Sequence, residues 1–124
     1  MPNKFLSQSN LPYNPLRKLR IVLNGLRFAI LYDFSVAYKV VVSVVVLAFA
    51  AYFSSSVNFL MVLLATALMM AAEMFNTAIE AICDYLETKQ DPKIGVIKDI
   101  AAAATWLCIA TWVVVVVYEV YTLF

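Results

Sequence analysis

Residues 73–84 read Glu-Met-Phe-Asn-Thr-Ala-Ile-Glu-Ala-Ile-Cys-Asp and follow a long apolar run that carries no charge. At 100° per residue, Glu80 and Asp84 fall within about 20° of Glu73 around a helix, and Asn76 falls within about 60° of it. The polar side chains therefore form one stripe on a helix that is otherwise apolar. Carboxylates in or near a bilayer are costly and usually serve an ion, a proton or a substrate. The stretch predicts a functional site at the edge of a membrane helix.

The composition indicates an integral membrane protein. The chain has 124 residues, of which 65% are hydrophobic, and its mean hydropathy is +0.88, whereas a soluble domain is nearer half apolar. This length accommodates one all-α domain with three membrane spans, so any chemistry must lie on the helices or at their ends. The absence of histidine removes the commonest general base and the commonest zinc ligand. The near-neutral net charge gives no indication of a nucleic-acid partner, and the two cysteines, which lack a CxxC spacing, are expected to be free thiols.

The helical elements follow from hydropathy and from residues that begin or break helices. Asn14 and Pro15 form a helix start, with Asn14 as the N-cap. We interpret residues 1–13 as a loose segment and residues 14–124 as the membrane domain. Pro92 and Gly95 predict that the polar connection after the second span is a turn. The predicted elements are a surface helix over 15–32 and spans over about 36–53, 58–86 and 97–121.

Two charged residues within the spans have ordinary interpretations. Lys39, near the start of the first span, can extend its ammonium group to the membrane interface. Glu119, near the end of the third span, is expected to be solvated at the far interface.

The helix predicted over residues 15–32 is amphipathic. Apolar residues cover one side, and the other side is mostly polar, with Arg17, Arg20, Asn24 and Arg27. One alternative is a soluble-type helix packed on a core. A helix lying on the membrane surface is the better interpretation, because a span follows at once and the polar side is basic.

The distribution of lysine and arginine predicts the orientation of the chain in the membrane. Five of these residues precede residue 28 and three lie between 87 and 99, whereas the turn at 54–58 has none. The positive-inside rule then places the N-terminus and the 87–99 connection in the cytoplasm and the C-terminus outside. Asp33, the acidic stripe and Lys98-Asp99 would then share one layer at the cytoplasmic interface.

A layer of carboxylates and a lysine beside a basic surface helix favours a reaction between a water-soluble anion and a lipid head group. Carboxylates can hold Mg²⁺, which in turn holds nucleotide phosphates, and Lys98 can offset phosphate charge. One carboxylate can take the proton of a lipid hydroxyl as it attacks a γ-phosphate. The sequence has no GxxxxGK[ST] loop and no kinase glycine loop. On the residues alone, a membrane enzyme and an ion pathway both remain open.

One motif narrows these alternatives. Its pattern is Glu73-x-x-Asn76-Thr77-Ala78-Ile79-Glu80-Ala81-x-x-Asp84, then Pro92, then Lys98-Asp99-x-Ala101-Ala102-x-Ala104. It resembles the signature of the small bacterial membrane diacylglycerol kinase and undecaprenol kinase family. The segment from Gly25-Leu26-Arg27 to Asp33 is similar to the surface-helix segment of that family, and the resemblance covers most of residues 14–121.

The resemblance implies a role for each matching residue. Glu73 corresponds to the catalytic base for the lipid hydroxyl, which also places it in the substrate site together with Arg27. Glu80 and Asp33 correspond to the metal-binding carboxylates for Mg²⁺, and both also face the nucleotide. The remaining residues implied at the ATP site are Asn76, Asp84, Gln90, Asp91, Lys98 and Asp99. The family further implies a homotrimer with sites between subunits, ATP as phosphate donor and a membrane lipid as acceptor.

The chain also departs from the family pattern. Asp33 stands where the family usually has glutamate, and its side chain is one methylene shorter. Asn14, Ala37 and Asp91 also differ from the residues usual there. The segments Asp91-Pro92 and 98–103 resemble the undecaprenol kinase branch more than the diacylglycerol kinase branch.

Each site residue has a plainer alternative. Glu73 or Asn76 can serve helix–helix contact, Asp33 can cap a helix, and Lys98 can set topology. For the whole protein, the alternative is a non-enzymatic membrane component, either an ion or proton pathway or a scaffold.

Overall fold

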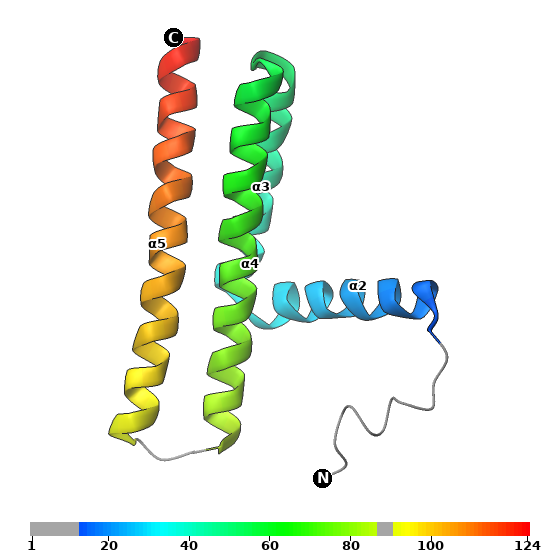
Figure 1. Cartoon of the computed structure of the whole chain (residues 1–124), viewed down its shortest axis with the longest axis vertical. Coiled ribbons are helices and arrows are strands. Elements are labelled where there is room, and N and C mark those ends of the chain that lie inside the picture. Colours follow the sequence, from blue (N-terminus) through cyan, green and yellow to red (C-terminus); the bar gives the residue numbers. More distant parts are fainter. Residues whose placement is uncertain (1–12, 87–90) are drawn as a thin grey trace.

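The computed structural model describes residues 13–86 and 91–124, and this part of the chain is all-helical. Its helices are α2 (Pro15–Tyr32), α3 (Phe34–Phe53), α4 (Ser56–Leu86) and α5 (Pro92–Leu123). In Figure 1 the helices α3, α4 and α5 run side by side, and α2 points away from the lower end of α3, below which α4 and α5 continue. The predicted all-α fold is confirmed, whereas the predicted loose segment lies outside the described residues except for Tyr13.

The start of α2 follows from its capping residue. The side-chain oxygen Oδ1 of Asn14 accepts hydrogen bonds from the backbone N–H groups of Leu16, at 3.0 Å, and Arg17, at 3.4 Å. Pro15 occupies the first helical position, where its missing N–H costs nothing. The cap predicted from the sequence is therefore present.

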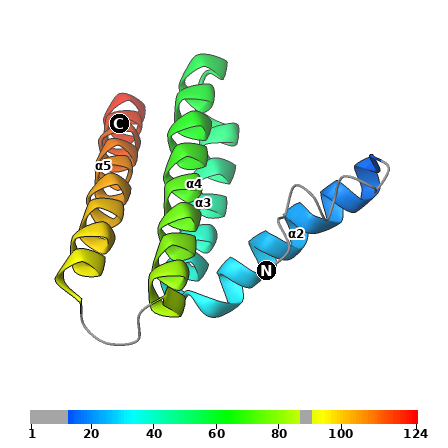
Figure 2. The same ribbon diagram turned by 60° about the horizontal axis from the view of Figure 1, so that its bottom comes forward.

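Asp33 separates α2 from α3 and belongs to neither helix. Its extended backbone ends α2, and its N–H group still donates to the carbonyl of Ala29, at 3.0 Å. Its Oδ1 atom accepts from the N–H of Ser35, at 2.9 Å, and so caps α3. A single residue thus ends one helix and begins the next, and the chain changes direction there (Figure 2).

The three helices α3, α4 and α5 are long and apolar enough to cross a membrane. The first two begin two residues earlier than predicted, at Phe34 and Ser56. The predicted turn around Gly95 is wrong, because α5 already begins at Pro92. Asp91 explains the difference: its Oδ1 atom accepts from the N–H of Lys93, at 2.8 Å, and its carbonyl accepts from Gly95, at 2.9 Å. A capping aspartate followed by proline therefore outweighs the low helix propensity of glycine.

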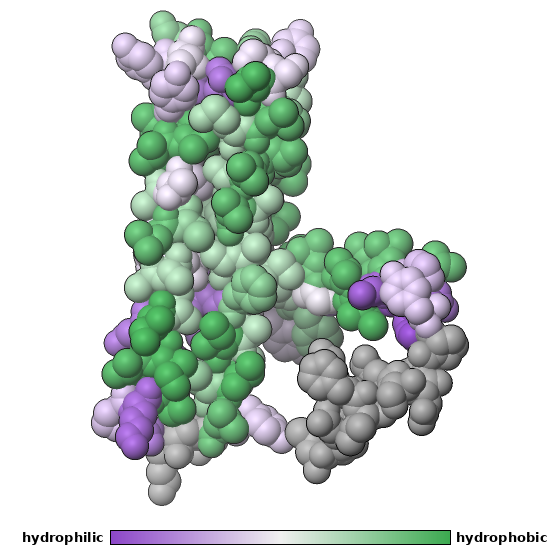
Figure 3. All heavy atoms as spheres, viewed as in Figure 1, coloured by the Kyte–Doolittle hydropathy of each residue, from purple (hydrophilic) through white to green (hydrophobic). Residues whose placement is uncertain are grey.

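The bundle packs through small side chains and leaves most of its large apolar ones exposed. The buried apolar residues are Ala29, Val36, Ala50, Val62, Ala65, Met69, Cys83 and Ala101. Small residues let helices approach closely in a membrane, and exposed apolar side chains suit contact with lipid. On the face seen in Figure 3, apolar side chains cover the middle of the bundle and hydrophilic ones gather toward its ends and on α2. Both cysteines are free, as predicted.

Polar side chains join the spans at two levels. The indole Nε1–H of Trp112 in α5 donates to the hydroxyl of Thr66 in α4, at 2.9 Å. Near the far end of the bundle, the hydroxyl of Ser54 donates to the carboxylate of Glu119. Glu119 is only 5% exposed, so the prediction that it is solvated is wrong. It is buried because the last turns of α5 pack beside the turn between α3 and α4.

The cap of α2 gives a local prediction. We expect Asn14→Ala to reduce the stability of the first turn by about 1 kcal/mol, because two backbone N–H groups lose their acceptor. Amide hydrogen exchange in detergent should then be roughly fivefold faster at residues 16–18. Asn14→Asp keeps an acceptor and should exchange like the original protein. Equal exchange in all three proteins would show that the cap contributes nothing.

Candidate active site

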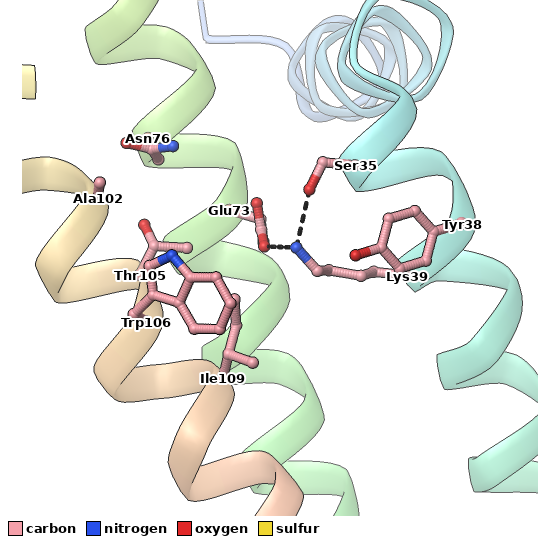
Figure 4. A pocket seen from close by; sticks show the side chains of 9 residues that line it. All are labelled: Ser35, Tyr38, Lys39, Glu73, Asn76, Ala102, Thr105, Trp106 and Ile109. Atoms are coloured by element: carbon pink, nitrogen blue, oxygen red, sulfur yellow. Dashed lines mark hydrogen bonds and ion pairs between the residues drawn. The ribbon is translucent and has the colours of Figure 1, made fainter.

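Glu73 is the best-protected carboxylate of the acidic stripe, since it is only 3% exposed. It forms an ion pair with Lys39 of α3. The Nζ atom of Lys39 also donates to the hydroxyl of Ser35, one turn earlier on α3, at 2.8 Å. Figure 4 shows the ammonium group lying between the carboxylate and the hydroxyl.

The ion pair between Lys39 and Glu73 compensates the charge of a carboxylate inside an apolar bundle. An ionised group removed from water is costly unless an opposite charge and hydrogen bonds compensate it. The side chain of Lys39 is 14% exposed and that of Glu73 is 4% exposed. Lys39 therefore points into the bundle, and the prediction that it extends to the interface is wrong.

A cavity of about 240 Å³ opens beside the ion pair. The α3 helix contributes Ser35, Tyr38 and Lys39 to its lining, and α4 contributes Glu73 and Asn76. The wall from α5 carries no charge and consists of Ala102, Thr105, Trp106 and Ile109. Among the lining residues in the described chain, Glu73 and Lys39 are thus the charged ones (Figure 4).

Asn76 has an unsatisfied acceptor at this cavity. Its amide Nδ2 donates to Oε1 of Glu80, at 3.3 Å. Its Oδ1 atom is buried and has no hydrogen-bond partner within the described residues. Buried polar atoms are nearly always paired, so this oxygen is suited to a ligand that supplies a donor or a cation.

Asp33 reaches the same face of α4. Its Oδ2 atom accepts a hydrogen bond from the hydroxyl of Thr77, at 2.7 Å. Thr77 lies one helical turn after Glu73 and one turn before Glu80. The carboxylate of Asp33 therefore lies at a level between those two glutamates of α4, although Asp33 and Thr77 are 44 positions apart in sequence.

The chemistry of these groups fits magnesium. Mg²⁺ prefers oxygen ligands and is commonly held by one or two carboxylates together with substrate phosphates and water. Asp33 and Glu80 offer carboxylates, and Asn76 offers its unpaired oxygen. No group of three or more acidic, histidine or cysteine side chains converges within residues 13–86 and 91–124. A metal held here would accordingly complete its coordination with phosphate and water oxygens.

Asp84 and Lys98 connect the end of α4 to the beginning of α5. Lys98 Nζ lies 2.6 Å from Asp84 Oδ1 in an ion pair whose side chains are 37% and 70% exposed, respectively. Exposed pairs of this kind contribute little to stability. Their position next to solvent instead leaves both charges accessible to a soluble ligand.

The other predicted site residues stand apart from the cavity lining. Asp99 and Arg27 are exposed, and Asp91 caps α5. Gln90 lies outside the described residues. The polar stripe of α4 therefore makes contacts in two directions. Glu73 and Thr77 contact residues at the start of α3, whereas Asp84 contacts Lys98 of α5.

The sequence did not identify Lys39 or Ser35 as site residues. The available signal was that Lys39 is the one charged residue within the first span, because intramembrane charges usually have a partner. Its partner lies 34 positions away on another helix, and periodicity within one helix cannot reveal such a contact.

Residues 20–120 match the model of a family described as prokaryotic diacylglycerol kinase. The matched range includes both the α3–α4 ion pair and the Asp84–Lys98 pair. Among curated proteins, none is similar enough to give a match.

The bond between Thr77 and Asp33 predicts a stability effect. Thr77→Val keeps the shape of the side chain but leaves the part-buried Asp33 carboxylate without its donor from α4. We expect the free energy of unfolding in mixed micelles to fall by about 2 kcal/mol, since hydrogen bonds to charged groups are the stronger ones. Thr77→Ser retains the hydroxyl and should lose much less. A loss of equal size in both variants would assign the effect to packing rather than to this bond.

Proposed function

The chain belongs to the prokaryotic diacylglycerol kinase family and is a lipid kinase, and we propose that it transfers the γ-phosphate of ATP, with Mg²⁺, to the hydroxyl of diacylglycerol or undecaprenol. The observation that carries the proposal is the buried carboxylate of Glu73, which lines a cavity between α3, α4 and α5. An ion pathway would instead favour acids deep in the bundle on facing helices. The non-enzymatic alternative is set aside by the family membership.

Glu73 is the proposed general base. Its carboxylate lines the cavity, where a lipid hydroxyl can approach it from the apolar side of the bundle. It would accept the hydroxyl proton as the oxygen attacks the γ-phosphorus. The uncharged α5 wall, with Trp106 and Ile109, would hold the apolar part of the lipid and exclude water from the reacting hydroxyl.

Asp33 and Glu80 are the proposed metal ligands. Bound magnesium would neutralise phosphate charge and orient the triphosphate. The aspartate in place of the usual glutamate is compatible with this role, because the Asp33 carboxylate already lies between the levels of Glu73 and Glu80 on α4. The remaining nucleotide contacts are proposed for Asn76, at the cavity, and for the polar residues toward the α4–α5 connection: Asp84, Gln90, Asp91, Lys98 and Asp99.

We further propose a homotrimer in the cytoplasmic membrane, with α2 on the cytoplasmic surface and Arg27 near lipid head groups. The basic α2 suits anionic lipid head groups. One chain leaves Glu80, Asp84 and Asp99 exposed and leaves Oδ1 of Asn76 unpaired. A neighbouring subunit that covers these residues would help to enclose the nucleotide.

The experiment that tests this function follows labelled γ-phosphate from Mg-ATP to lipid in detergent micelles. Diacylglycerol and undecaprenol are offered separately to the purified protein. Phosphatidic acid as the main product identifies the first acceptor, and undecaprenyl phosphate identifies the second. The resemblance of residues 98–103 to the undecaprenol branch favours the second product. No product from either lipid, with an assembled protein in hand, contradicts the proposal.

The same assay tests the base. Glu73→Gln keeps the size of the side chain and its capacity to accept a hydrogen bond from Lys39, but it cannot take a proton at the reacting hydroxyl. We expect the rate of transfer to fall by about 10²–10⁴-fold. Insertion and assembly, followed by gel filtration, should be preserved. Near-normal turnover in this variant would remove Glu73 from the role of base.

Glu80 tests the metal assignment. We expect Glu80→Ala to raise the Mg²⁺ concentration that gives half-maximal activity by about tenfold or more, because one of the proposed carboxylate ligands is lost. Glu119→Gln is a matched control, since it removes a carboxylate at the far end of the bundle. An unchanged magnesium dependence in Glu80→Ala would contradict its role as a ligand.

A further inference from the structure

Lys39 has no role in the proposed reaction so far, although it touches the proposed base. Its ammonium group is held at the cavity by the hydroxyl of Ser35 and by the carboxylate of Glu73. An ammonium group has three N–H donors, and these two contacts occupy two of them. The third is available to a group that enters the cavity.

The charge balance around Lys39 must change during transfer. Glu73 becomes neutral when it accepts the hydroxyl proton, and the part-buried ammonium group of Lys39 then loses its compensating anion. The neighbouring elements offer no carboxylate in its place: the cavity wall from α5 is uncharged, and Tyr38 presents its ring, whose centroid lies 5.3 Å from the Lys39 Nζ atom. Asp33 is engaged with Ser35 and Thr77, and Glu80 lies on the exposed side of α4, where it pairs with Asn76. Arg27, the last charged residue of α2, is a cation and cannot compensate the charge of Lys39.

The transferring phosphoryl group is the anion that arrives at this moment. Its three equatorial oxygens carry negative charge in the transition state. In a water-excluded cavity, a cation already aimed at such oxygens stabilises the transition state more than the ground state. Lys39 is held by Ser35 at one turn's distance along α3, so its ammonium group remains in place when its bond to Glu73 weakens.

We propose that Lys39 is a catalytic residue that contacts an oxygen of the phosphoryl group during its transfer. The inference rests on the proposed function. In the step, the hydroxyl proton passes to Glu73, and the hydroxyl oxygen forms a bond to the γ-phosphorus. The bond from that phosphorus to the bridging oxygen breaks, and its electron pair leaves with ADP. Lys39 neither gains nor loses a proton, and its hydrogen bond moves from the Glu73 carboxylate to the phosphoryl oxygen.

The first test is the kinetics of Lys39→Gln with Mg-ATP and the preferred lipid. We expect kcat to fall by about 10²–10³-fold, as for other groups that stabilise developing charge. The KM for Mg-ATP should stay within about threefold, because the contact forms in the transition state and not in the ground state. Lys39→Arg keeps the cation and should recover part of kcat. Lys18→Gln, which removes a lysine charge from α2 away from the cavity, is the control and should leave both constants unchanged.

The second test uses the unaltered protein and therefore does not depend on how a variant folds. An ADP derivative that carries an aldehyde on its β-phosphate places an electrophile where the γ-phosphate would lie. After borohydride reduction, mass spectrometry should find the label on Lys39 and not on Lys18. Excess Mg-ATP should prevent the labelling.

The outcomes separate this inference from the proposed function. An original protein that transfers no phosphate and takes no label contradicts the kinase assignment itself. An active protein labelled only at Lys98, or a Lys39→Gln variant with near-normal kcat, overturns the role of Lys39 and leaves the kinase intact. A loss of kcat that Lys39→Arg does not relieve, without labelling of Lys39, would assign the residue a structural role and overturn the proposal as well.

Discussion

The requirement that a buried carboxylate be balanced by a cation sets the arrangement of the bundle. Glu73 lies inside an apolar helix, where an unpaired charge would be strongly unfavourable. Lys39 meets this requirement from α3, and the contact fixes how α3 is rotated and at what height it stands against α4. The cavity beside the pair is a consequence, because the residues around it carry small or uncharged side chains on the side of α5.

Asp33 supports this arrangement from outside the bundle. One of its oxygens begins α3, and the other accepts from Thr77 of α4. The same carboxylate therefore orients the helix that carries Lys39 and ties it to the helix that carries Glu73. Its two interactions are independent of the ion pair, so the first turns of α3 are held at two points. At the opposite end of the bundle, the hydrogen bond between Ser54 and Glu119 joins the end of α3 to α5.

The fold was largely predictable because its signals are local. Hydropathy predicted three spans, and the helix start at Asn14 followed from the preferences of capping residues. One error concerns a local helix cap, and two concern contacts between distant residues. Gly95 lies in a helix because Asp91 caps the start of α5. Lys39 and Glu119 lie away from the interfaces because each has a partner elsewhere in the bundle. The rotation of each helix decides such contacts, and hydropathy does not determine it.

The candidate site was predictable only where its signal is local to one helix. The stripe from Glu73 to Asp84 follows from helical periodicity, whereas the contact between Asp33 and Thr77 was not predicted, because the two residues are 44 positions apart in sequence. The division of the stripe between α3 and α5 was not predictable, because it depends on where two other helices pack around α4.

The distance along α3 from Asp33 to Lys39 relates the depth of the ion pair in the membrane to the position of the junction between α2 and α3. Six residues of helix correspond to a rise of about 9 Å. With α2 lying in the membrane surface, as proposed, the ion pair would lie about 9 Å below it, in the upper part of the acyl layer. A lipid whose hydroxyl resides at this level meets Glu73 without leaving its leaflet, whereas one that is anchored higher or lower would have to shift along the membrane normal. In that orientation, the position of Asp33 at the start of α3 would set the depth in the bilayer at which an acceptor hydroxyl reaches Glu73.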